Sequence, residues 1–258
     1  MNIRALHPIP RPSPSLVHLP SPDLSLTFPP PLHISFFVSD LSPFPPFDHR
    51  PFICAAWRVL QCYLRGLHQI TITHPCPIPL AGPAILVCNH ISGLDPLVLQ
   101  SACPHLVTWM MAREYYDQPL GRWFFQRIGA IPVDRSGRDL AATRAAFRDL
   151  AAGHTLGIFP EGRIAPTPDL QPFQTGVALV AIKANVPVYP ACIEGSMRNL
   201  DLLEAFLCPQ RITLSFGPPV VFDRSNTSRP TINSATAAIR AAVLSLRPPP
   251  NAPSPLKP

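Results

Sequence analysis

The distribution of proline limits which part of this chain can form a packed domain. The chain of 258 residues contains 37 prolines, many of them near its start, in runs such as Pro8–Pro12 and Pro29–Pro31. Proline has a fixed φ and no backbone N–H, so such a segment cannot form a helix or a sheet ladder. We therefore expect residues 1–51 to be disordered or extended, or to be non-native leader sequence. Residues 247–258 are expected to form a similar tail.

Between these ends, short apolar segments alternate with helical ones. The predicted strands cover residues 69–73, 84–88, 106–112, 155–159, 186–193, 211–216 and 220–222. The predicted helices cover residues 52–69, 95–102, 121–127, 138–152, 177–184 and 231–246. This alternation favours a central, mostly parallel sheet with helices on both faces. We expect a single α/β domain over residues 75–246, preceded by an amphipathic helix and its lead-in over residues 52–74.

The segment 52–69, drawn as a helix, has two different faces. Its polar face has Arg58, Gln61 and Arg65, and its apolar face has Trp57, Leu60, Leu64 and Leu67. A basic amphipathic helix with a tryptophan is suited to the headgroup layer of a membrane. The alternative is a helix that packs its apolar face on the domain. The two arginines interrupt the apolar window that comes nearest to a membrane span.

The charge balance indicates an anionic partner. The formal net charge is +6, which fits phosphate groups or an anionic membrane surface. Nucleic acid is not expected, because the arginines are scattered, lysine is nearly absent and no nucleic-acid-binding motif is present. The seven cysteines form no Cys-x-x-Cys pair and no cluster with histidine, which favours buried thiols over disulfides or zinc. No metal site is expected.

A polar turn directly follows the apolar strand 84–88. His90 stands two residues beyond this strand, and Asp95 follows His90 by five residues. In α/β folds, reactive groups lie at the ends of buried strands. The carboxylate of Asp95 could keep one ring nitrogen of His90 protonated and leave the other free to accept a proton. The alternative is that Asp95, which precedes Pro96, caps a helix.

Four blocks of sequence share an order with a known family. They are Cys88–Pro96, Gly129–Arg135, Gly157–Arg163 and Val186–Ala191. Together they resemble the four motifs of the 1-acylglycerol-3-phosphate acyltransferase family, the glycerolipid acyltransferases, over roughly residues 75–223. The resemblance implies transfer of a fatty acyl group to a hydroxyl of a lysophospholipid at the cytoplasmic face of a membrane. It also implies a lipid substrate and acyl-CoA or acyl carrier protein as the thioester co-substrate, with no other cofactor.

The chemistry of acyl transfer assigns roles to the first and third blocks. The acceptor hydroxyl must lose its proton as it attacks, and the carbonyl oxygen must be stabilised as it gains charge. His90 and Asp95 are the expected catalytic residues. No Gly-x-Ser-x-Gly elbow is present, so direct transfer is expected rather than a serine acyl-enzyme. Backbone amides near the third block are candidates for the oxyanion donors.

The resemblance places four residues at the acceptor. Arg135 and Arg163 would clamp its phosphate, because a guanidinium matches phosphate oxygens bidentately and stays charged. Glu161 and Gly162 match motif residues that help to shape the acceptor site. The alternatives are that Arg135 is a solvated surface charge and that Glu161 and Gly162 form an ordinary turn after a strand.

Two positions depart from the family pattern. The usual third motif reads Phe-Pro-Glu-Gly-Thr/Ser-Arg, whereas Arg163 directly follows Gly162 here. Either Arg163 replaces the hydroxyl residue in place, or the loop is one residue shorter. Gln174 stands where members often have lysine. These departures leave open an acyltransferase for glycerol 3-phosphate or another lipid alcohol or amine. A catalytically silent lipid-binding protein is a further alternative, against which the intact His90 and Asp95 argue.

Overall fold

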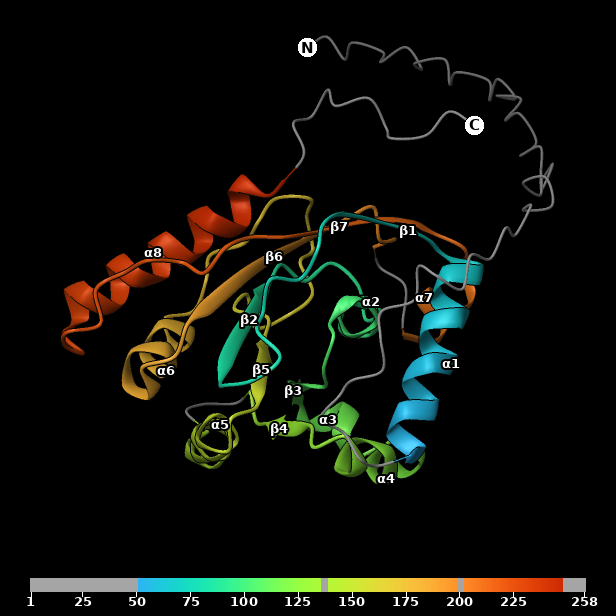
Figure 1. Ribbon diagram of the computed structural model, residues 1–258, viewed down its shortest axis with the longest axis horizontal. Helices are drawn as coiled ribbons and strands as arrows, with labels where there is room; N and C mark the ends of the chain where they lie inside the picture. Colours follow the sequence, from blue (N-terminus) through green and yellow to red (C-terminus); the bar gives the residue numbers. More distant parts are fainter. Residues whose placement is uncertain (1–50, 136–138, 199–201, 248–258) are drawn as a thin grey trace, which may run out of the picture. The chain divides into compact units, whose positions relative to one another are not determined.

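The structure is a computed structural model, and it describes residues 51–135, 139–198 and 202–247 (Figure 1). Of the expected tails, 1–51 and 247–258, residues 1–50 and 248–258 lie outside the described residues. In chain order the elements are α1 (Pro51–Leu67), β1 (Gln69–His74), β2 (Ala84–Cys88), α2 (Asp95–Ala102), β3 (Val107–Ala112), α3 (Arg113–Tyr116), α4 (Pro119–Arg127), β4 (Ile131–Val133), α5 (Leu140–Ala151), β5 (Thr155–Ile158), α6 (Gly176–Ala184), β6 (Val188–Glu194), α7 (Leu202–Leu207), β7 (Arg211–Phe216) and α8 (Arg229–Ser245).

The seven strands form one sheet in the order β1-β7-β6-β2-β5-β3-β4. All neighbouring pairs among them are parallel except β6–β7, so the expectation of a mostly parallel sheet is confirmed. The central strand β2 pairs with β5 from Ala84 opposite Thr155 and with β6 from Ile85 opposite Val188. All five residues of β2 are buried, as expected for a strand with helices on both sides.

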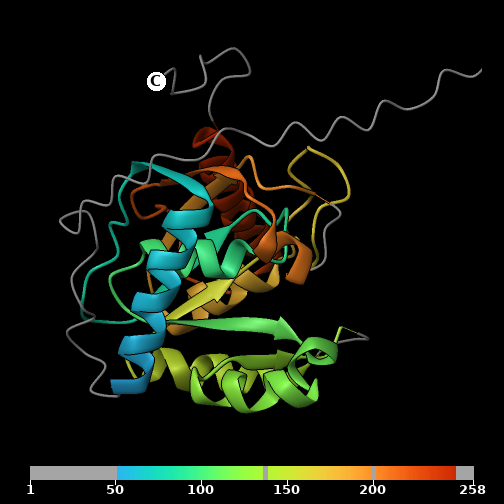
Figure 2. The ribbon, with the colours of Figure 1, turned by 90° about the vertical axis from the view of Figure 1, so that its right-hand side faces the viewer.

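Helices cover both faces of the sheet, as predicted. Alternate residues of β2 divide the core: Leu86 packs in a cluster with residues of α1 and α2, and Ile85 packs in a cluster with residues of α5, α6 and α8. Figure 1 shows α5, α6 and α8 on one side of the sheet, with α1 and α2 on the other. In Figure 2, α3 and α4 lie at the edge formed by β3 and β4. Burial of each large aliphatic side chain contributes about 1.5–3 kcal/mol.

One predicted strand is absent, and one strand of the structure was not predicted. Residues 220–222 are not a strand, although the Val220 N–H donates to the Val188 carbonyl at 2.8 Å. The preceding prolines, 218 and 219, have no N–H to donate to a ladder, and Val221 is 93% exposed. Conversely, β4 was not predicted, because its three residues include Pro132, which a sheet tolerates at an edge.

The helix α1 is confirmed, but its apolar face packs on the domain. Trp57 is 5% exposed, and its indole N–H donates to the Gln100 carbonyl at 3.1 Å. Gln61, expected on the polar face, is fully buried and donates to the Ser101 carbonyl at 2.8 Å. Leu64 is also fully buried. Trp57 and Leu64 thus pack on the domain, as in the core-packing alternative, and membrane association of this segment stays a prediction. No helix in the described ranges is long and apolar enough to span a bilayer.

Candidate active site

The turn after β2 is tied to the neighbouring strand β6. The side chain of Asn89 is buried, and its amide donates to the Ile193 carbonyl at 2.8 Å while its oxygen accepts the Ile193 N–H at 2.8 Å. This reciprocal pair imitates one step of a sheet ladder beyond the end of β2. His90 therefore leaves the sheet at a fixed point, on the carboxyl edge between β5 and β6. The crevice at such an edge is where open α/β sheets bind ligands.

The side chains of His90 and Asp95 meet in this turn. His90 Nδ1 lies 2.9 Å from Asp95 Oδ2, and the same oxygen accepts the N–H groups of Ile91 at 2.7 Å and Ser92 at 2.9 Å. The Ser196 hydroxyl donates to Asp95 Oδ1 at 3.4 Å. Because a carboxylate only accepts, Nδ1 carries the proton and Nε2 is left with its lone pair free to accept one. The predicted pair of base and orienter thus has the required geometry.

The helix-capping alternative for Asp95 does not hold. The N-cap of α2 is Leu94, and no side chain caps this helix. Asp95 is the first residue of the helix and is fully buried. Its carboxylate accepts the turn N–H groups of residues 91 and 92, which come before the helix, and not those of the first helical turn.

The imidazole of His90 lies on an aromatic stack. Its ring is 4.1 Å from the ring of Phe159 at an angle of 17°, and Phe159 in turn stacks on Trp109 at 5.2 Å. Gly157 on β5 makes room for this stack, because a Cβ there would lie 2.4 Å from the Trp109 ring. The His90 side chain is 17% exposed, and Nε2 forms no hydrogen bond with another described residue. This nitrogen is therefore available to a substrate hydroxyl.

Glu161 contacts the main chain of His90. Its Oε1 accepts the His90 N–H at 2.8 Å, and its Oε2 accepts the Gln171 N–H at 3.1 Å. The residue is 7% exposed, and burial raises the pKa of its carboxyl group, although the two N–H groups favour the charged form. The carboxylate of Glu161 thus joins the first and third sequence blocks.

Gly162 occupies a position that only glycine fits well. Its φ is +76°, and an added Cβ would lie 2.1 Å from the side-chain nitrogen of Gln174. Two backbone amides of this turn are already engaged: the Gly162 N–H donates to the Phe159 carbonyl at 3.0 Å, and the Ala165 N–H donates to the His90 carbonyl at 2.7 Å. These two amides are therefore not free to act as the oxyanion donors expected near the third block.

The two candidate arginines lie further out. Arg135 follows β4, three strands away from β2, which places the ends of these strands about 14 Å apart at the usual strand spacing. Its guanidinium is exposed and forms an ion pair with Glu114. Arg163 is exposed and follows Glu161 by two residues. The structure therefore brings His90, Asp95, Glu161 and Gly162 together at one edge, with Arg135 at the outer strand.

Three supporting residues were not found from the sequence. Asn89 lies inside the first block, so its adjacency to His90 was an available signal. Ser196 is 101 residues from Asp95, and Gln171, ten residues after Glu161, contributes its backbone N–H, which any residue except proline has.

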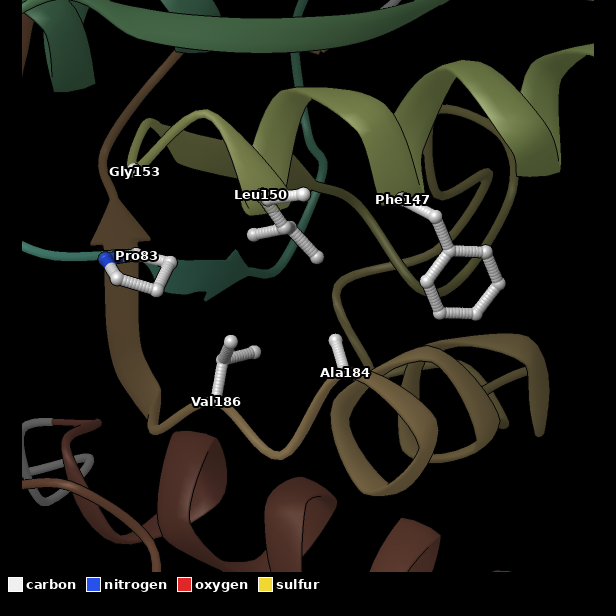
Figure 3. A pocket seen from close by; sticks show the side chains of 7 residues that line it. Pro83, Phe147, Leu150, Gly153, Ala184 and Val186 are labelled. Atoms are coloured by element: carbon white, nitrogen blue, oxygen red, sulfur yellow. The ribbon is translucent and has the colours of Figure 1, made fainter.

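One cavity of the molecule lies away from this site. A pocket of about 330 Å³ lies between α5 and α6, lined by apolar residues that include Pro83, Leu150 and Val186 (Figure 3). Pro83 and Val186 precede β2 and β6, so this pocket is at the amino ends of the strands, opposite His90. Its lining contains no titratable side chain. In the part of the chain that the structure describes, no group of three or more His, Cys, Asp or Glu side chains could hold a metal ion.

These features define an α/β protein with a histidine oriented by an aspartate at the carboxyl edge of its central strand. Residues 69–194, which run from β1 through β6, match the family model described as Acyltransferase. This region therefore forms a domain of the Acyltransferase family, as the four sequence blocks indicated.

Individual relatives agree with this assignment. A protein from Mycoplasma pneumoniae named "Probable 1-acyl-sn-glycerol-3-phosphate acyltransferase" is 31% identical over 153 residues, which are 55% of this chain and 55% of that protein. The 1-acyl-sn-glycerol-3-phosphate acyltransferase of Bacillus subtilis is 24% identical over 128 residues, 49% of this chain and 63% of that protein. The chain thus spans between half and two thirds of the length of these curated relatives.

A solved structure has the same fold. The crystal structure of the 1-acyl-sn-glycerophosphate (LPA) acyltransferase PlsC from Thermotoga maritima superposes with a TM-score of 0.60 and 20% sequence identity. The match covers 78% of this chain and 85% of that one.

Proposed function

We propose that this protein transfers a fatty acyl group from a thioester donor to a hydroxyl of a lysophospholipid, with 1-acylglycerol 3-phosphate as the acceptor. The observation that carries the proposal is the His90–Asp95 pair, whose Nδ1–Oδ2 distance is 2.9 Å, inside a domain of the Acyltransferase family. The names of the relatives that match this domain point to the same acceptor.

The geometry suits direct transfer with His90 as the general base. His90 Nε2 takes the proton of the acceptor hydroxyl as its oxygen bonds to the thioester carbon. The C–S bond then breaks, and the imidazolium returns the proton to the leaving thiolate. Asp95 keeps the ring in the required tautomer and stabilises the imidazolium. A positioned base of this kind contributes about 10²–10⁴-fold to the rate.

The acceptor phosphate is proposed to bind through Arg163 and Arg135. Both guanidinium groups are exposed and lie at the carboxyl edge of the sheet, and each can form charge-assisted bonds to phosphate. Because Arg135 is paired with Glu114, it must exchange this partner for the phosphate. The proposed donor is acyl-CoA or acyl carrier protein, and no other cofactor is required by this chemistry.

We also propose that the enzyme works as a peripheral protein at the cytoplasmic face of a membrane. The surface that supports this is formed by α3 and α4. On this surface Tyr115 is 52% exposed and Trp123 is 53% exposed. The Arg127 guanidinium lies 4.8 Å from the centre of the Trp123 ring. Amphipathic aromatic rings beside arginines are typical of a protein surface that contacts anionic headgroups. Because α3 directly follows β3, this surface adjoins the sheet edge that holds His90.

The test is a product assay with the purified full chain. Lysophosphatidic acid, glycerol 3-phosphate and a phosphate-free lipid alcohol are each incubated with oleoyl-CoA or oleoyl carrier protein, and the lipids are identified by mass spectrometry. The expected product is phosphatidic acid from lysophosphatidic acid, absent with the His90→Ala variant. Faster acylation of glycerol 3-phosphate or of the alcohol would show that this compound, and not lysophosphatidic acid, is the acceptor. No acylation of any acceptor by the folded protein would contradict the proposed activity.

A further inference from the structure

The main chain of His90 is held from both sides by the segment that follows β5. Its N–H donates to Glu161 at 2.8 Å, and its carbonyl accepts the Ala165 N–H at 2.7 Å. The orientation of the imidazole therefore depends on where residues 161–165 lie, in addition to the bond from Asp95. An error of about 1 Å in the placement of a reacting group can cost on the order of 10²-fold in rate.

Through Glu161, the position of His90 also depends on a longer segment, residues 165–171. We call these residues the cover segment. Because Glu161 Oε2 accepts the Gln171 N–H at 3.1 Å, the far end of the cover segment helps to place the carboxylate that holds His90. Both carboxylate oxygens are thus engaged by backbone N–H groups, and the side chain is only 7% exposed.

The cover segment cannot hold itself in place with a regular ladder. The segment contains Pro166 and Pro168, and Pro172 follows it directly. These residues have no N–H, so the segment has fewer backbone donors for its own carbonyl groups. Gln171 bridges part of it through its side-chain amide, which donates to the Thr167 hydroxyl at 2.9 Å and to the Asp169 carbonyl at 2.8 Å.

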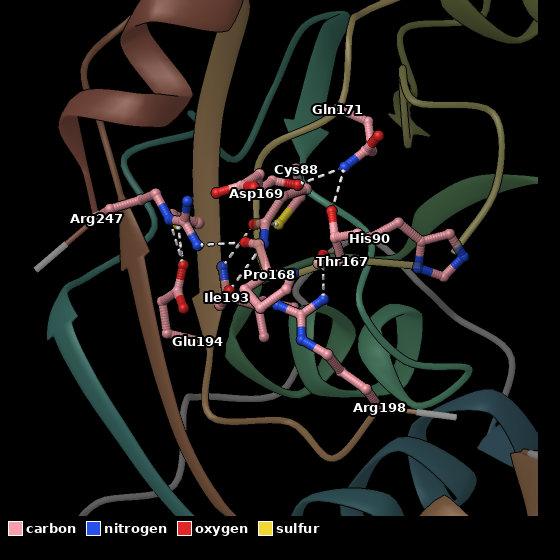
Figure 4. Close-up of polar contacts among 12 residues, drawn as sticks. Cys88, His90, Thr167, Pro168, Asp169, Gln171, Ile193, Glu194, Arg198 and Arg247 are labelled. Carbon is pink, nitrogen blue, oxygen red and sulfur yellow. Dashed lines mark hydrogen bonds and ion pairs between the residues drawn. The ribbon is translucent and has the colours of Figure 1, made fainter. Parts of the chain in front are cut away.

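Three arginines from outside the segment donate to its carbonyl groups, and Figure 4 shows two of them, Arg198 and Arg247. The Arg198 guanidinium donates to the Thr167 carbonyl and that of Arg247 donates to the Pro168 carbonyl, both at 2.8 Å. Arg240 on α8 donates to the Leu170 carbonyl at 2.7 Å and to the Gln171 carbonyl at 3.4 Å.

The anchors differ in how directly they reach the site. Arg247 is itself fixed by Glu194 at the end of β6, at 2.6 Å. Arg240 donates to the carbonyl of Gln171, and the N–H of Gln171 donates to Glu161. Arg240 is therefore the anchor with the fewest hydrogen-bonded steps to His90. Both Arg240 and Arg247 lie beyond residue 194, where the match to the family model ends.

We propose that Arg240 and Arg247 are positioning residues for the catalytic histidine, acting through the cover segment and Glu161. Glu161 then serves to place His90 rather than to bind the acceptor. This inference rests on the proposed acyl transfer for its kinetic test. It assigns to the C-terminal helix a role in catalysis that does not require contact with either substrate.

The test compares arginines of the same helix. Arg240→Gln removes an anchor, and Arg229→Gln changes an exposed arginine at the start of α8. With lysophosphatidic acid and oleoyl-CoA, Arg240→Gln is expected to lower kcat by about tenfold, with both KM values unchanged. Arg240→Lys, which keeps one cationic donor, should recover part of the rate. Arg229→Gln should match the wild type.

A double-mutant cycle separates positioning from general stability. If Arg240 acts through Glu161, the kcat of Arg240→Gln/Glu161→Gln should be close to that of Glu161→Gln alone. Multiplicative losses in kcat would overturn the proposal. So would an Arg240→Gln protein with wild-type kcat, or one whose acceptor KM rises while kcat is kept, since the latter indicates direct binding of the phosphate.

A measurement without turnover distinguishes this inference from the proposed activity. Amide hydrogen exchange at His90 and Gln171 should be faster in Arg240→Gln than in Arg229→Gln, whatever reaction the protein catalyses. Equal exchange in the two variants would show that the anchor does not hold His90. If exchange changes but the wild type acylates no acceptor, the proposed function fails and the structural coupling stands.

Discussion

Asp95 Oδ2 lies 2.9 Å from His90 Nδ1 and within 2.9 Å of the N–H groups of the two residues that follow His90. One oxygen therefore sets both the tautomer of the histidine and the shape of the turn that presents it. The Asp95 carboxylate is fully buried, so loss of its charge leaves the donors of the turn without a strong acceptor.

The first prediction concerns this pair. His90→Ala should lower the rate of acyl transfer by about 10²–10⁴-fold, because the base is lost. Asp95→Asn should lose much of the rate as well, and should destabilise the fold by about 1–3 kcal/mol because donors in the turn lose a charged acceptor. Steady-state kinetics and urea unfolding measure the two effects. Near-normal turnover by a folded His90→Ala protein would contradict the mechanism.

The second prediction concerns Gly162. Gly162→Ala should lower the free energy of unfolding by about 1–3 kcal/mol, because its φ of +76° is unfavourable for a side chain. Contact with Gln174 adds to this cost, and Gly162→Ala/Gln174→Ala should recover that part. The matched control is Gly176→Ala, where a Cβ would meet nothing within 4 Å. Equal stabilities of the Gly162 and Gly176 variants in urea would refute the assignment.

The third prediction is a pH dependence that belongs to Glu161. Burial raises the pKa of this carboxyl, so the folded protein binds its proton more tightly than the unfolded chain does. The associated stabilisation is complete below the ordinary carboxyl pKa and is lost as the pH rises through the raised value. The free energy of unfolding of the wild type, minus that of Glu161→Gln, should therefore fall across this window. Urea titrations of both proteins at a series of pH values check the sign, and a rise would contradict it.

The fourth prediction concerns the surface of α3 and α4. Trp123→Glu should weaken binding to anionic lipid vesicles by at least about tenfold, because an apolar ring is lost and a repelled charge is gained. Vesicle sedimentation at low and high salt measures the affinity. The control is Val221→Glu, the same charge change at a side chain that is 93% exposed after β7. Equal affinities of the two variants would show that this surface is not the one that meets the membrane.

The fifth prediction concerns the acceptor phosphate. Arg163→Ala and Arg135→Ala should each raise the acceptor KM by about ten to a hundredfold and leave the donor KM unchanged, since each removes a charge-assisted bond. Glu114→Gln should have the opposite effect, because it releases Arg135 from its ion pair. If Arg163 only replaces the motif's hydroxyl residue, Arg163→Ser should retain the wild-type acceptor KM. Unchanged acceptor kinetics in both alanine variants would exclude the clamp.

The local parts of the site could be predicted from the sequence. His90 and Asp95 are five residues apart in one turn after an apolar strand, so their contact depends on a short stretch of chain. The alternation of strands and helices likewise identified a mostly parallel α/β sheet, because apolar periodicity reports the face that each element buries. The strand predicted at 220–222 is absent because the two prolines before it have no N–H to donate to a ladder, which apolar character alone does not reveal.

The tertiary structure decided the contacts between distant segments. The orientation of Trp57 on α1 depends on carbonyl groups at the end of α2, more than forty residues away. The amphipathic pattern of α1 is the same for a face that meets a membrane and for one that packs on a core. Glu161 lies beside His90 because β5 pairs with β2, although 71 residues separate the two. The anchoring of the cover segment by Arg240 spans a similar gap in sequence. A sequence pattern specifies which face of an element is apolar, and the packing of the whole sheet determines which distant residue that face meets.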